Sequence, residues 1–317
     1  MIEVITGGLQ TTVQDLGRRG VMHLGIGQSG VMDTLSAISA NRLVGMDDNN
    51  PVLECTLVGP SLKFHDDMLI AICGSDMTFT LQQQAIQQNR PIAVSKGTTL
   101  TFKSNHLGAR AYIAFSKTMD IQPVLGSVAT HLGAGIGGLN GRALMKGDII
   151  QFIDVEPLAK ADLEKISTAR YAGHYQIRYT SSPESNNFSA AQLEHFVKQK
   201  YQVTKEFNRM GIRLTGWAIN FAEYPSMLSK GLLPGAIQIP PDGLPIIAGK
   251  DAQTTGGYVR IGQIIQADLP IIGQLQTNDE IQFQAISLSD AMLINQTQAE
   301  LLKLFNTATW WQVIKPG

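Results

Sequence analysis

Short runs in which apolar and polar residues alternate, each bounded by turn residues, recur along most of this chain. Alternation with a period of two places side chains on opposite faces of a β-strand, so these runs predict strands that bury one face. Closely spaced strands of this kind favour a barrel or a sandwich. In the first half the predicted strands are Ser61–Phe64, Met68–Cys73, Met77–Leu81, Ile92–Ser95, Thr99–Phe102 and Ala111–Phe115. In the second half they are Ile237–Ile239, Pro245–Ala248, Tyr258–Ile261, Ile264–Ala267 and Glu280–Ala285.

Helices are expected at few places. Thr34–Val44 has an Asp33 N-cap, Ala190–Lys200 is preceded by Ser189, and Asp290–Phe305 is the longest. The polar segment 156–172 lacks strand alternation and is predicted to join two domains, with room for a helical turn around Ala159–Ile166. The expected organisation is therefore mainly β, with one unit over residues 1–160 and another over 172–317.

Composition narrows the functional classes. Charged residues make up 16% of the 317, below the usual ~25%, which suits a chain that buries surface against a partner. The net charge is −1 without any basic run, so nucleic-acid binding is not expected. No apolar run is long enough to span a membrane, and no signal peptide is recognisable. Cys55 and Cys73 lie in apolar segments, as buried thiols of a reducing compartment do, which favours the cytoplasm.

Asp251–Gly262 carries the densest set of functional groups. Amide, hydroxyl, phenol and guanidinium groups occur together with two adjacent glycines, which let a backbone approach a ligand closely. Arg260 offers a planar fork for a carboxylate or phosphate. A glycine hairpin with Tyr258 and Arg260 pointing out of a strand is the structural alternative.

A second segment has the same character. Thr11–Gly20, which contains Arg18 and Arg19, leads to His23 and then to Gly25–Asp33. Asp33 precedes a predicted helix, so it is expected to be an N-cap, although a helix N-terminus can also attract an anion.

These two segments resemble blocks of the biotin-dependent carboxyltransferase family, and further similar blocks are Asn41–Gly45, Asn208–Leu214 and Pro234–Gly243. The similar blocks extend from about residue 10 to about residue 285. The family groups the C subunit of 5-oxoprolinase, a Kip-type regulator that antagonises an inhibitor of a sporulation kinase, and part of urea amidolyase.

The resemblance implies two cyclophilin-like barrel units and one component, the C subunit, of an ATP-dependent enzyme that opens 5-oxoproline to glutamate. The implied partners are a Kip-inhibitor-like B subunit and an A subunit of the lactam-utilisation type. Two alternatives remain open: a non-enzymatic Kip-type regulator and a urea-type carboxyl transfer.

The resemblance also suggests roles for individual residues. Asp251 and Tyr258 are candidate proton handlers for the amide. The candidate substrate-binding residues are Arg19, His23, Asp33, Arg209, Gln253, Thr254, Thr255, Gly256, Gly257 and Arg260. We expect Thr11–Asp33 and 251–260 to form one concave surface, because both are polar and contain glycine and arginine.

Several common sites are not expected. Met145–Lys146 lacks the second methionine of a biotin-attachment hairpin, so no covalent biotin is predicted. No phosphate-binding G-x-x-x-x-G-K motif occurs, so ATP is expected to bind together with a partner protein. The histidines and cysteines lack metal-ligand spacing. Gly133–Gly138 matches a dinucleotide pattern, but residues 140–148 read as turn, short strand and turn rather than as a helix.

Two residues depart from the pattern expected for the family. Lys230 stands where a glutamate is expected, which reverses a charge and could shift the substrate or abolish activity. Val259 stands where a proline is expected, and this change is predicted to be mild.

Overall fold

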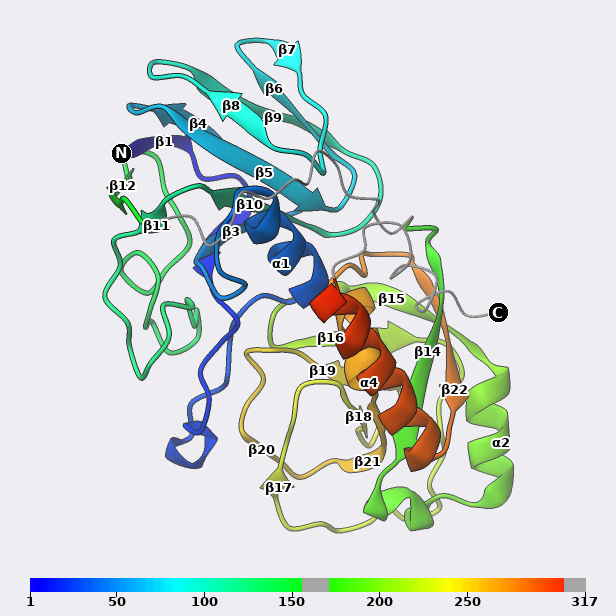
Figure 1. Cartoon of the computed structure of the whole chain (residues 1–317). Helices are drawn as coiled ribbons and strands as arrows, with labels where there is room; N and C mark the ends of the chain where they lie inside the picture. The colour runs from blue at the N-terminus through cyan, green and yellow to red at the C-terminus, as the bar shows by residue number, and fades with distance from the viewer. Residues whose placement is uncertain (156–170, 305–317) are drawn as a thin grey trace. The chain divides into compact units, whose positions relative to one another are not determined.

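The computed structural model describes residues 1–155 and 171–304, shown in Figure 1. The chain forms two compact units: Met1–Val21 with Gln28–Tyr171, and Met22–Gly27 with Ala172–Gly317. With 36% strand and 17% helix, the predicted mainly β class is confirmed. The helical turn considered around Ala159–Ile166 lies outside the described residues, as does nearly all of the predicted junction.

The first unit contains thirteen strands and one α-helix among its described residues. The strands are β1 (Ile2–Thr6), β2 (Gln10–Gln14), β3 (Val52–Thr56), β4 (Ser61–Phe64), β5 (Met68–Gly74), β6 (Met77–Leu81), β7 (Gln84–Ala85), β8 (Ile92–Val94), β9 (Thr99–Asn105), β10 (Arg110–Phe115), β11 (Thr118–Met119), β12 (Ile149–Ile150) and β13 (Phe152–Ile153). The helix is α1 (Thr34–Leu43).

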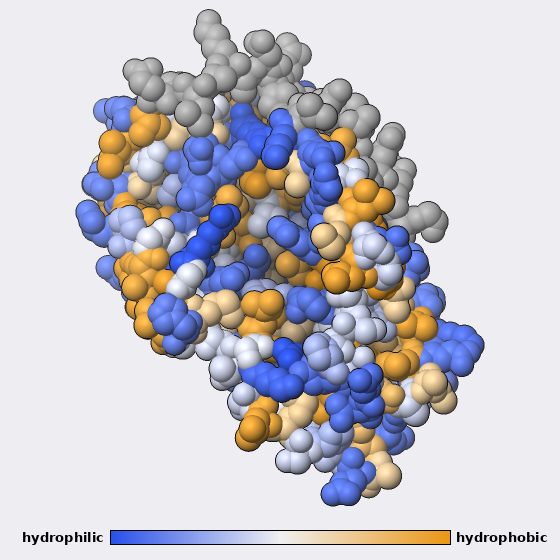
Figure 2. All heavy atoms as spheres, turned by 60° about the horizontal axis from the view of Figure 1, so that its bottom comes forward, coloured by the Kyte–Doolittle hydropathy of each residue, from blue (hydrophilic) through white to orange (hydrophobic). Residues whose placement is uncertain are grey.

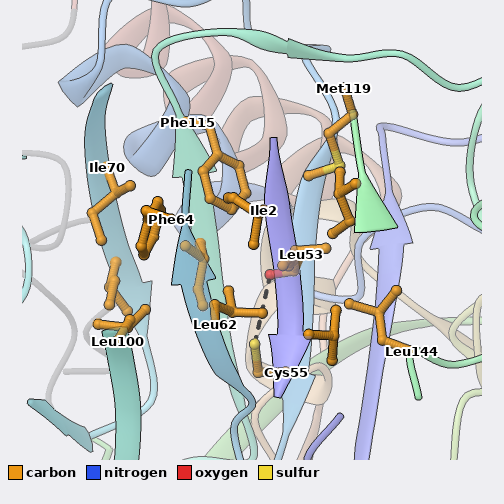
Figure 3. Close-up of a cluster of buried hydrophobic side chains, with 14 of the residues drawn as sticks. Ile2, Leu53, Cys55, Leu62, Phe64, Ile70, Leu100, Phe115, Met119 and Leu144 are labelled. Atoms are coloured by element: carbon orange, nitrogen blue, oxygen red, sulfur yellow. Dashed lines mark hydrogen bonds between the residues drawn. The ribbon is translucent and has the colours of Figure 1, made fainter. Parts of the chain in front are cut away.

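These strands form two larger sheets around one core. One has the order β12-β1-β4-β9-β6-β7, the other β2-β3-β10-β5-β8, and β11 pairs with β13. Side chains from both sheets meet in one apolar cluster, in which Leu53, Phe64 and Phe115 are fully buried (Figure 3). Helix α1 packs on β5 and β10. The first unit therefore buries its apolar faces between two sheets.

The second unit contains nine strands among its described residues. They are β14 (His174–Ser181), β15 (Lys200–Phe207), β16 (Gly211–Thr215), β17 (Lys230–Gly231), β18 (Ala236–Ile239), β19 (Ile246–Ala248), β20 (Thr255–Gly256), β21 (Val259–Ile264) and β22 (Glu280–Ala285). The helices are α2 (Ala190–Lys198), α3 (Leu269–Ile272) and α4 (Leu288–Leu304), and the 3-10 helices are η1 (Met22–Leu24), η2 (Pro183–Asn187) and η3 (Gln266–Asp268).

Seven of these strands close into a barrel in the order β14-β21-β18-β19-β16-β15-β22. Strand β22 pairs with β15 in antiparallel and with β14 in parallel orientation. Helix α2 begins with a complete capping box at Ser189, as the sequence predicts for its N-terminus. It buries Phe196, which stacks on Phe283 of β22 with ring centroids 4.8 Å apart. This helix thereby covers one side of the barrel.

Two predicted strands are wrong. The sequence predicts one strand over Ile264–Ala267, but β21 ends at Ile264 and η3 follows. Asp268 is buried, and its carboxylate accepts hydrogen bonds from the Arg178 backbone amide and guanidinium, which turns the chain away from the ladder. The short strand expected between residues 140 and 148 is absent, because turns that place Asp148 on Arg142 occupy this stretch.

The glycine-rich stretch 133–141 consists of turns without a following helix, so it does not form a dinucleotide-binding element. Gly137 has a φ of +70°, and a Cβ there would lie 2.1 Å from the Ala129 carbonyl oxygen and 2.5 Å from Arg18 Nη2. Glycine is therefore required by close packing around the buried Arg18 side chain.

On the face shown in Figure 2, polar and apolar side chains are interspersed without one dominant apolar area. No helix among the residues that the structure describes is both long and apolar enough to cross a membrane.

Candidate functional site

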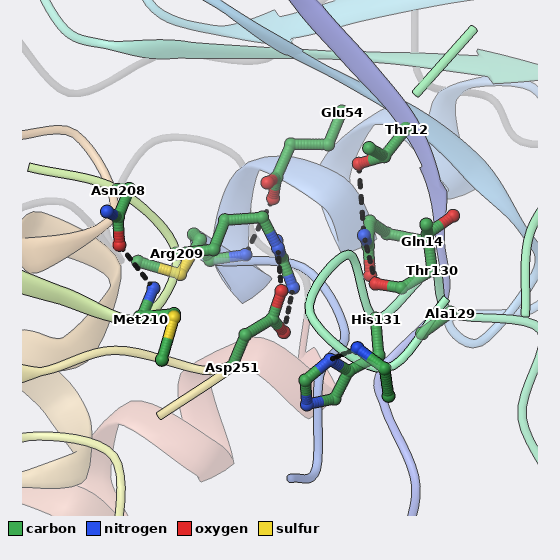
Figure 4. A network of polar contacts seen from close by, with 12 residues as sticks. Thr12, Gln14, Glu54, Ala129, Thr130, His131, Asn208, Arg209, Met210 and Asp251 are labelled. Atoms are coloured by element: carbon green, nitrogen blue, oxygen red, sulfur yellow. Dashed lines mark hydrogen bonds and ion pairs between the residues drawn. The ribbon is translucent and has the colours of Figure 1, made fainter. Parts of the chain in front are cut away.

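Arg209 and Asp251, two of the predicted site residues, are partners of each other in the second unit (Figure 4). Arg209 Nε lies 2.8 Å from Asp251 Oδ2, and Arg209 Nη2 lies 2.9 Å from Oδ1. Both side chains are only 2% exposed. A bidentate pair of this kind fixes both groups in orientation. The predicted anion-binding guanidinium of Arg209 is thus paired with the carboxylate of Asp251, the predicted acid–base group.

The backbone around this pair is equally constrained. Asn208 Oδ1 accepts hydrogen bonds from the amides of Met210 and Gly211, which shapes the turn between β15 and β16. The Asp251 amide donates to the Arg209 carbonyl oxygen at 2.8 Å. A Cβ at Gly249 would lie 2.2 Å from that same oxygen, so glycine is required there. Residues 249–251 are therefore fastened to the turn that carries Arg209.

A groove of about 470 Å³ lies on the outer face of the barrel. Ile212, Ile237 and Ile247 point into the barrel core, so the residues that alternate with them on β16, β18 and β19 face outward. We call this the barrel groove; its lining residues are Lys205, Glu206, Phe207, Asn208, Met210, Gly211, Arg213, Leu232, Gln238, Ile246, Ala248, Ala252 and Gln253. Its volume is within the range that holds small molecules.

The polar groups of the barrel groove are mostly amides and cations. Asn208, Gln238 and Gln253 supply amides, and Lys205 supplies positive charge, whereas Arg213 Nε lies 3.2 Å from Oε2 of the lining residue Glu206. Gln238 is 6% exposed, and its Nε2 has no hydrogen-bond partner among the described residues. A buried donor without a partner costs about 1–3 kcal/mol, so such groups tend to occur where a ligand or water is bound. The groove suits a small molecule that combines an amide with a carboxylate.

Arg260, another predicted anion-binding residue, forms its own cluster. Its Nη2 lies 2.7 Å from Glu184 Oε1, and its Nη1 donates to the Gly231 carbonyl oxygen at 2.7 Å. Lys230 Nζ donates to the same Glu184 oxygen at 2.9 Å. Burial alone would raise the pKa of Glu184, but hydrogen bonds from Arg260 and Lys230 outweigh it and lower the pKa to about 2. Glu184 is therefore ionised at neutral pH.

The remaining predicted residues of the second unit lie along β20 and its flanks. Thr255 and Gly256 form β20, which pairs with β17, and the Thr254 carbonyl oxygen accepts from the Leu232 amide. Gly256 packs against the side-chain amide of Gln238, because a Cβ at position 256 would lie 2.7 Å from Gln238 Nε2. Tyr258 is 42% exposed. His23 lies in η1 and is exposed.

Val259 differs from the expected proline in a way that the structure explains. Its backbone amide donates to the Tyr224 hydroxyl at 3.1 Å, and that hydroxyl donates to the Ile239 carbonyl oxygen at 2.7 Å. Proline has no amide hydrogen, so this bridge between β18 and β21 needs a residue other than proline at position 259.

In the first unit, Asp33 is the N-cap of α1. Its Oδ1 accepts from the Ser36 amide at 3.0 Å and its Oδ2 from the Ser36 hydroxyl at 2.6 Å. The side chain is 1% exposed, and the predicted cap is confirmed. Arg19, in contrast, is exposed, whereas its neighbour Arg18 is buried and binds backbone carbonyl oxygens.

A buried polar network that the sequence did not predict lies beside this cap. Glu54 Oε2 accepts from the Tyr112 hydroxyl at 2.9 Å and from the Met32 amide at 2.7 Å, and Arg110 Nε lies 3.6 Å from Glu54 Oε1. All of these side chains except that of Met32 are at most 1% exposed. Burial and the nearby Glu54 carboxylate raise the pKa of Tyr112. The available signal was that Glu54 and Arg110 each lie inside a predominantly apolar strand. Charged residues are rarely buried without partners, so each of these two charges predicts a buried partner.

The second missed residue is Glu184, which lies in η2 and is 4% exposed. It follows Pro183 in a polar stretch that resembles an ordinary surface turn. Nothing in its local sequence distinguishes it, because its partners Lys230 and Arg260 lie far away along the chain.

The chain is similar to proteins of one family over nearly its whole length. The family described as carboxyltransferase domain, subdomain A and B, matches residues 24–285. The C subunit of the 5-oxoprolinase of Escherichia coli is 36% identical over 313 residues, which cover 98% of each chain. The corresponding protein of Haemophilus influenzae is 32% identical over 291 residues, which cover 92% of this chain and 93% of the relative.

A solved structure shows the same similarity. The crystal structure of the urea amidolyase of K. lactis superimposes with a TM-score of 0.91 at 31% identity, covering 97% of this chain. This chain corresponds to only 20% of that much longer protein.

Proposed function

Because this chain belongs to the carboxyltransferase domain family, subdomain A and B, we propose that it is the C subunit of a 5-oxoprolinase. The observation that supports this best is the end-to-end match with the Escherichia coli C subunit, in which 98% of each chain is aligned. In the urea amidolyase of K. lactis, the matching region is a fifth of one long chain.

The proposed reaction opens the five-membered lactam of 5-oxoproline with water and ATP, giving glutamate, ADP and phosphate. A lactam is a stable amide, so its carbonyl carbon needs activation. Transfer of the γ-phosphoryl group to the amide oxygen makes the carbon electrophilic, so water adds to it and the ring C–N bond breaks as the nitrogen is protonated. The resulting acyl phosphate is hydrolysed by a second water, with phosphate as the leaving group. In this proposal ATP is a substrate that binds together with the Kip-inhibitor-like B subunit and the lactam-utilisation-type A subunit.

The barrel groove supports this choice of substrate chemistry. Lys205 provides positive charge for the carboxylate of 5-oxoproline, beside the Arg213–Glu206 ion pair in the groove lining. Asn208 and Gln253 provide amide groups that match the donor and acceptor of a lactam. Asp251 stays the proposed proton handler together with Tyr258, with Arg209 fixing its carboxylate. Arg19, His23, Thr254, Thr255 and Gly257 remain proposed substrate-binding residues.

Reconstitution tests the proposal. The three proteins are expressed together, and the formation of glutamate and ADP from 5-oxoproline and ATP is measured with and without this chain. We expect turnover only with all three. Equal turnover by the other two proteins without this chain would contradict the proposal.

One variant tests the barrel groove within that assay. Gln253→Ala removes an exposed amide from its rim, so the KM for 5-oxoproline is expected to rise about tenfold while kcat changes little. Lys146→Ala, which alters an exposed turn of the first unit, is the control and should leave both values unchanged. Equal effects of the two variants would remove the groove from the proposal.

The similarity to urea amidolyase favours a second candidate, urea-type carboxyl transfer. It needs a biotin carrier from another protein. Transfer of the carboxyl group from a carboxybiotin carrier to urea by this chain, with no turnover of 5-oxoproline, would select that candidate.

A further inference from the structure

Glu184 connects three segments that are distant in the sequence. It lies in η2, which directly follows Ser182, whose hydroxyl donates to the Arg260 carbonyl oxygen of β21. Its carboxylate receives the Arg260 guanidinium from β21 and the Lys230 ammonium from β17. Arg260 also donates to the Gly231 carbonyl oxygen, so Glu184 holds Lys230 directly and Gly231 through Arg260.

Strand β17 in turn determines where β20 lies. Lys230 pairs with Gly256 and Gly231 with Thr255, and the Leu232 amide donates to the Thr254 carbonyl oxygen at 2.8 Å. Leu232 and Gln253, which flank this pairing, both line the barrel groove. The two-stranded sheet β17–β20 therefore connects the Glu184 cluster to the wall of the groove.

This small sheet needs external support. Each of its strands has two residues, and isolated two-stranded ladders are at best marginally stable in water. Charge-assisted hydrogen bonds are roughly twice as strong as neutral ones, and Glu184 receives them from both Lys230 and Arg260. Glu184 is 4% exposed, whereas Lys230 is half-exposed, so the buried end of the contact is the carboxylate.

We propose that Glu184 is a positioning residue, whose carboxylate holds β17–β20 through Lys230 and Arg260 and thereby fixes Gln253 and Leu232 at the barrel groove. It touches no substrate itself. We call the contacts of Glu184 with Lys230 and Arg260 the Glu184 clamp. Lys230 stands where the family resemblance leads us to expect glutamate. A glutamate at this position would place a second carboxylate beside Glu184 in place of the ammonium. The catalytic part of the inference rests on the proposed function, whereas the structural part does not.

The first test uses hydrogen–deuterium exchange on the isolated full-length chain. Glu184→Gln keeps the shape of the side chain and removes its charge, and we expect amides 230–232 and 254–256 to exchange at least about tenfold faster. Glu194→Gln is the matched control, because Glu194 forms an exposed ion pair with Lys198 on α2. Unchanged exchange protection of the β17–β20 sheet, or equally faster exchange in every barrel strand, would overturn the proposal.

The second test uses kinetics in the reconstituted complex. Glu184→Gln should raise the KM for 5-oxoproline about tenfold with kcat within about threefold of wild type, because a displaced wall weakens binding rather than the chemical step. Lys230→Met should give the same pattern and serves as the test variant if Glu184→Gln does not fold. A fall in kcat at constant KM would overturn the positioning role. Wild type without turnover of 5-oxoproline would refute the proposed function, and the exchange experiment would still decide the clamp.

Discussion

At the scale of single residues, the side chains with the most constrained contacts are those whose partners come from distant segments. The sequence correctly identifies Asp33 as a helix cap, because capping depends on neighbours three residues away. It could mark Glu54 as a charge within an apolar strand but could not pair it with Tyr112, and it could not assign Glu184, since their partners lie more than forty residues away along the chain. Arg209 and Asp251 are predicted separately from the sequence as site residues, and only the structure shows that they are paired.

Tyr224 offers a test at this scale. Tyr224→Phe removes the hydroxyl that bridges Val259 and Ile239 and leaves the amide of the fully buried Val259 unpaired. We expect the free energy of unfolding, measured by urea denaturation, to fall by about 1–3 kcal/mol. Tyr258→Phe, which changes a phenol that is 42% exposed, is the control and should stay within about 0.5 kcal/mol of wild type. Equal stability of the two variants would show that the bridge contributes nothing.

At the scale of elements, local pattern predicted all of the longer helices but only ten of the 22 strands among the described residues, and it missed the barrel strands β14, β15 and β16. Alternation depends on residues next to one another, so runs such as Met77–Leu81 and Ala111–Phe115 carry their own signal. Strand pairing does not, because it is decided by contacts between distant segments. The parallel pairing of β14 with β22 could not be read from either strand alone. The error at Ile264–Ala267 has the same origin, since Asp268 turns the chain by binding Arg178.

The contacts of Glu184 with Lys230 and Arg260 predict how the stability of the β17–β20 sheet depends on pH. The folded pKa of Glu184, about 2, lies below its ordinary value of 4.5, so its stabilising contribution is fully present above pH 4.5 and is lost as the pH falls through 2. We therefore expect the difference in unfolding free energy between wild type and Glu184→Gln to be constant from about pH 7 to about pH 5. It should shrink steadily between about pH 4 and about pH 2. Urea denaturation across this range measures it, and a difference independent of pH would argue against an ionised clamp.

At the scale of the whole molecule, the chain is a pair of β units with few charged residues. The low charged fraction of 16% and the similarity to a protein named as a subunit both favour a role within a complex. The face in Figure 2 shows no single apolar area that would identify the contact by itself. The predicted surface shared by Thr11–Asp33 and 251–260 stays a prediction, because these residues are distributed over the two units.

Association with a partner can be measured directly. We expect this chain and a Kip-inhibitor-like protein to elute together in size-exclusion chromatography at micromolar concentration, because burying a weakly charged surface favours stable association. Each protein run alone is the control. Separate elution, both with and without ATP, would count against the complex and in favour of a chain that acts by itself.

The closed barrel has one more consequence, for the order in which this protein can fold during its synthesis. Strand β14 is the first strand of the second unit and β22 the last, and they pair directly with each other in parallel register. The ring of seven strands is therefore incomplete until Ala285 has left the ribosome. Until then both β14 and β15 expose an unpaired edge to other nascent chains. The final strand thus both closes the ring and removes the edges at which a growing chain could aggregate.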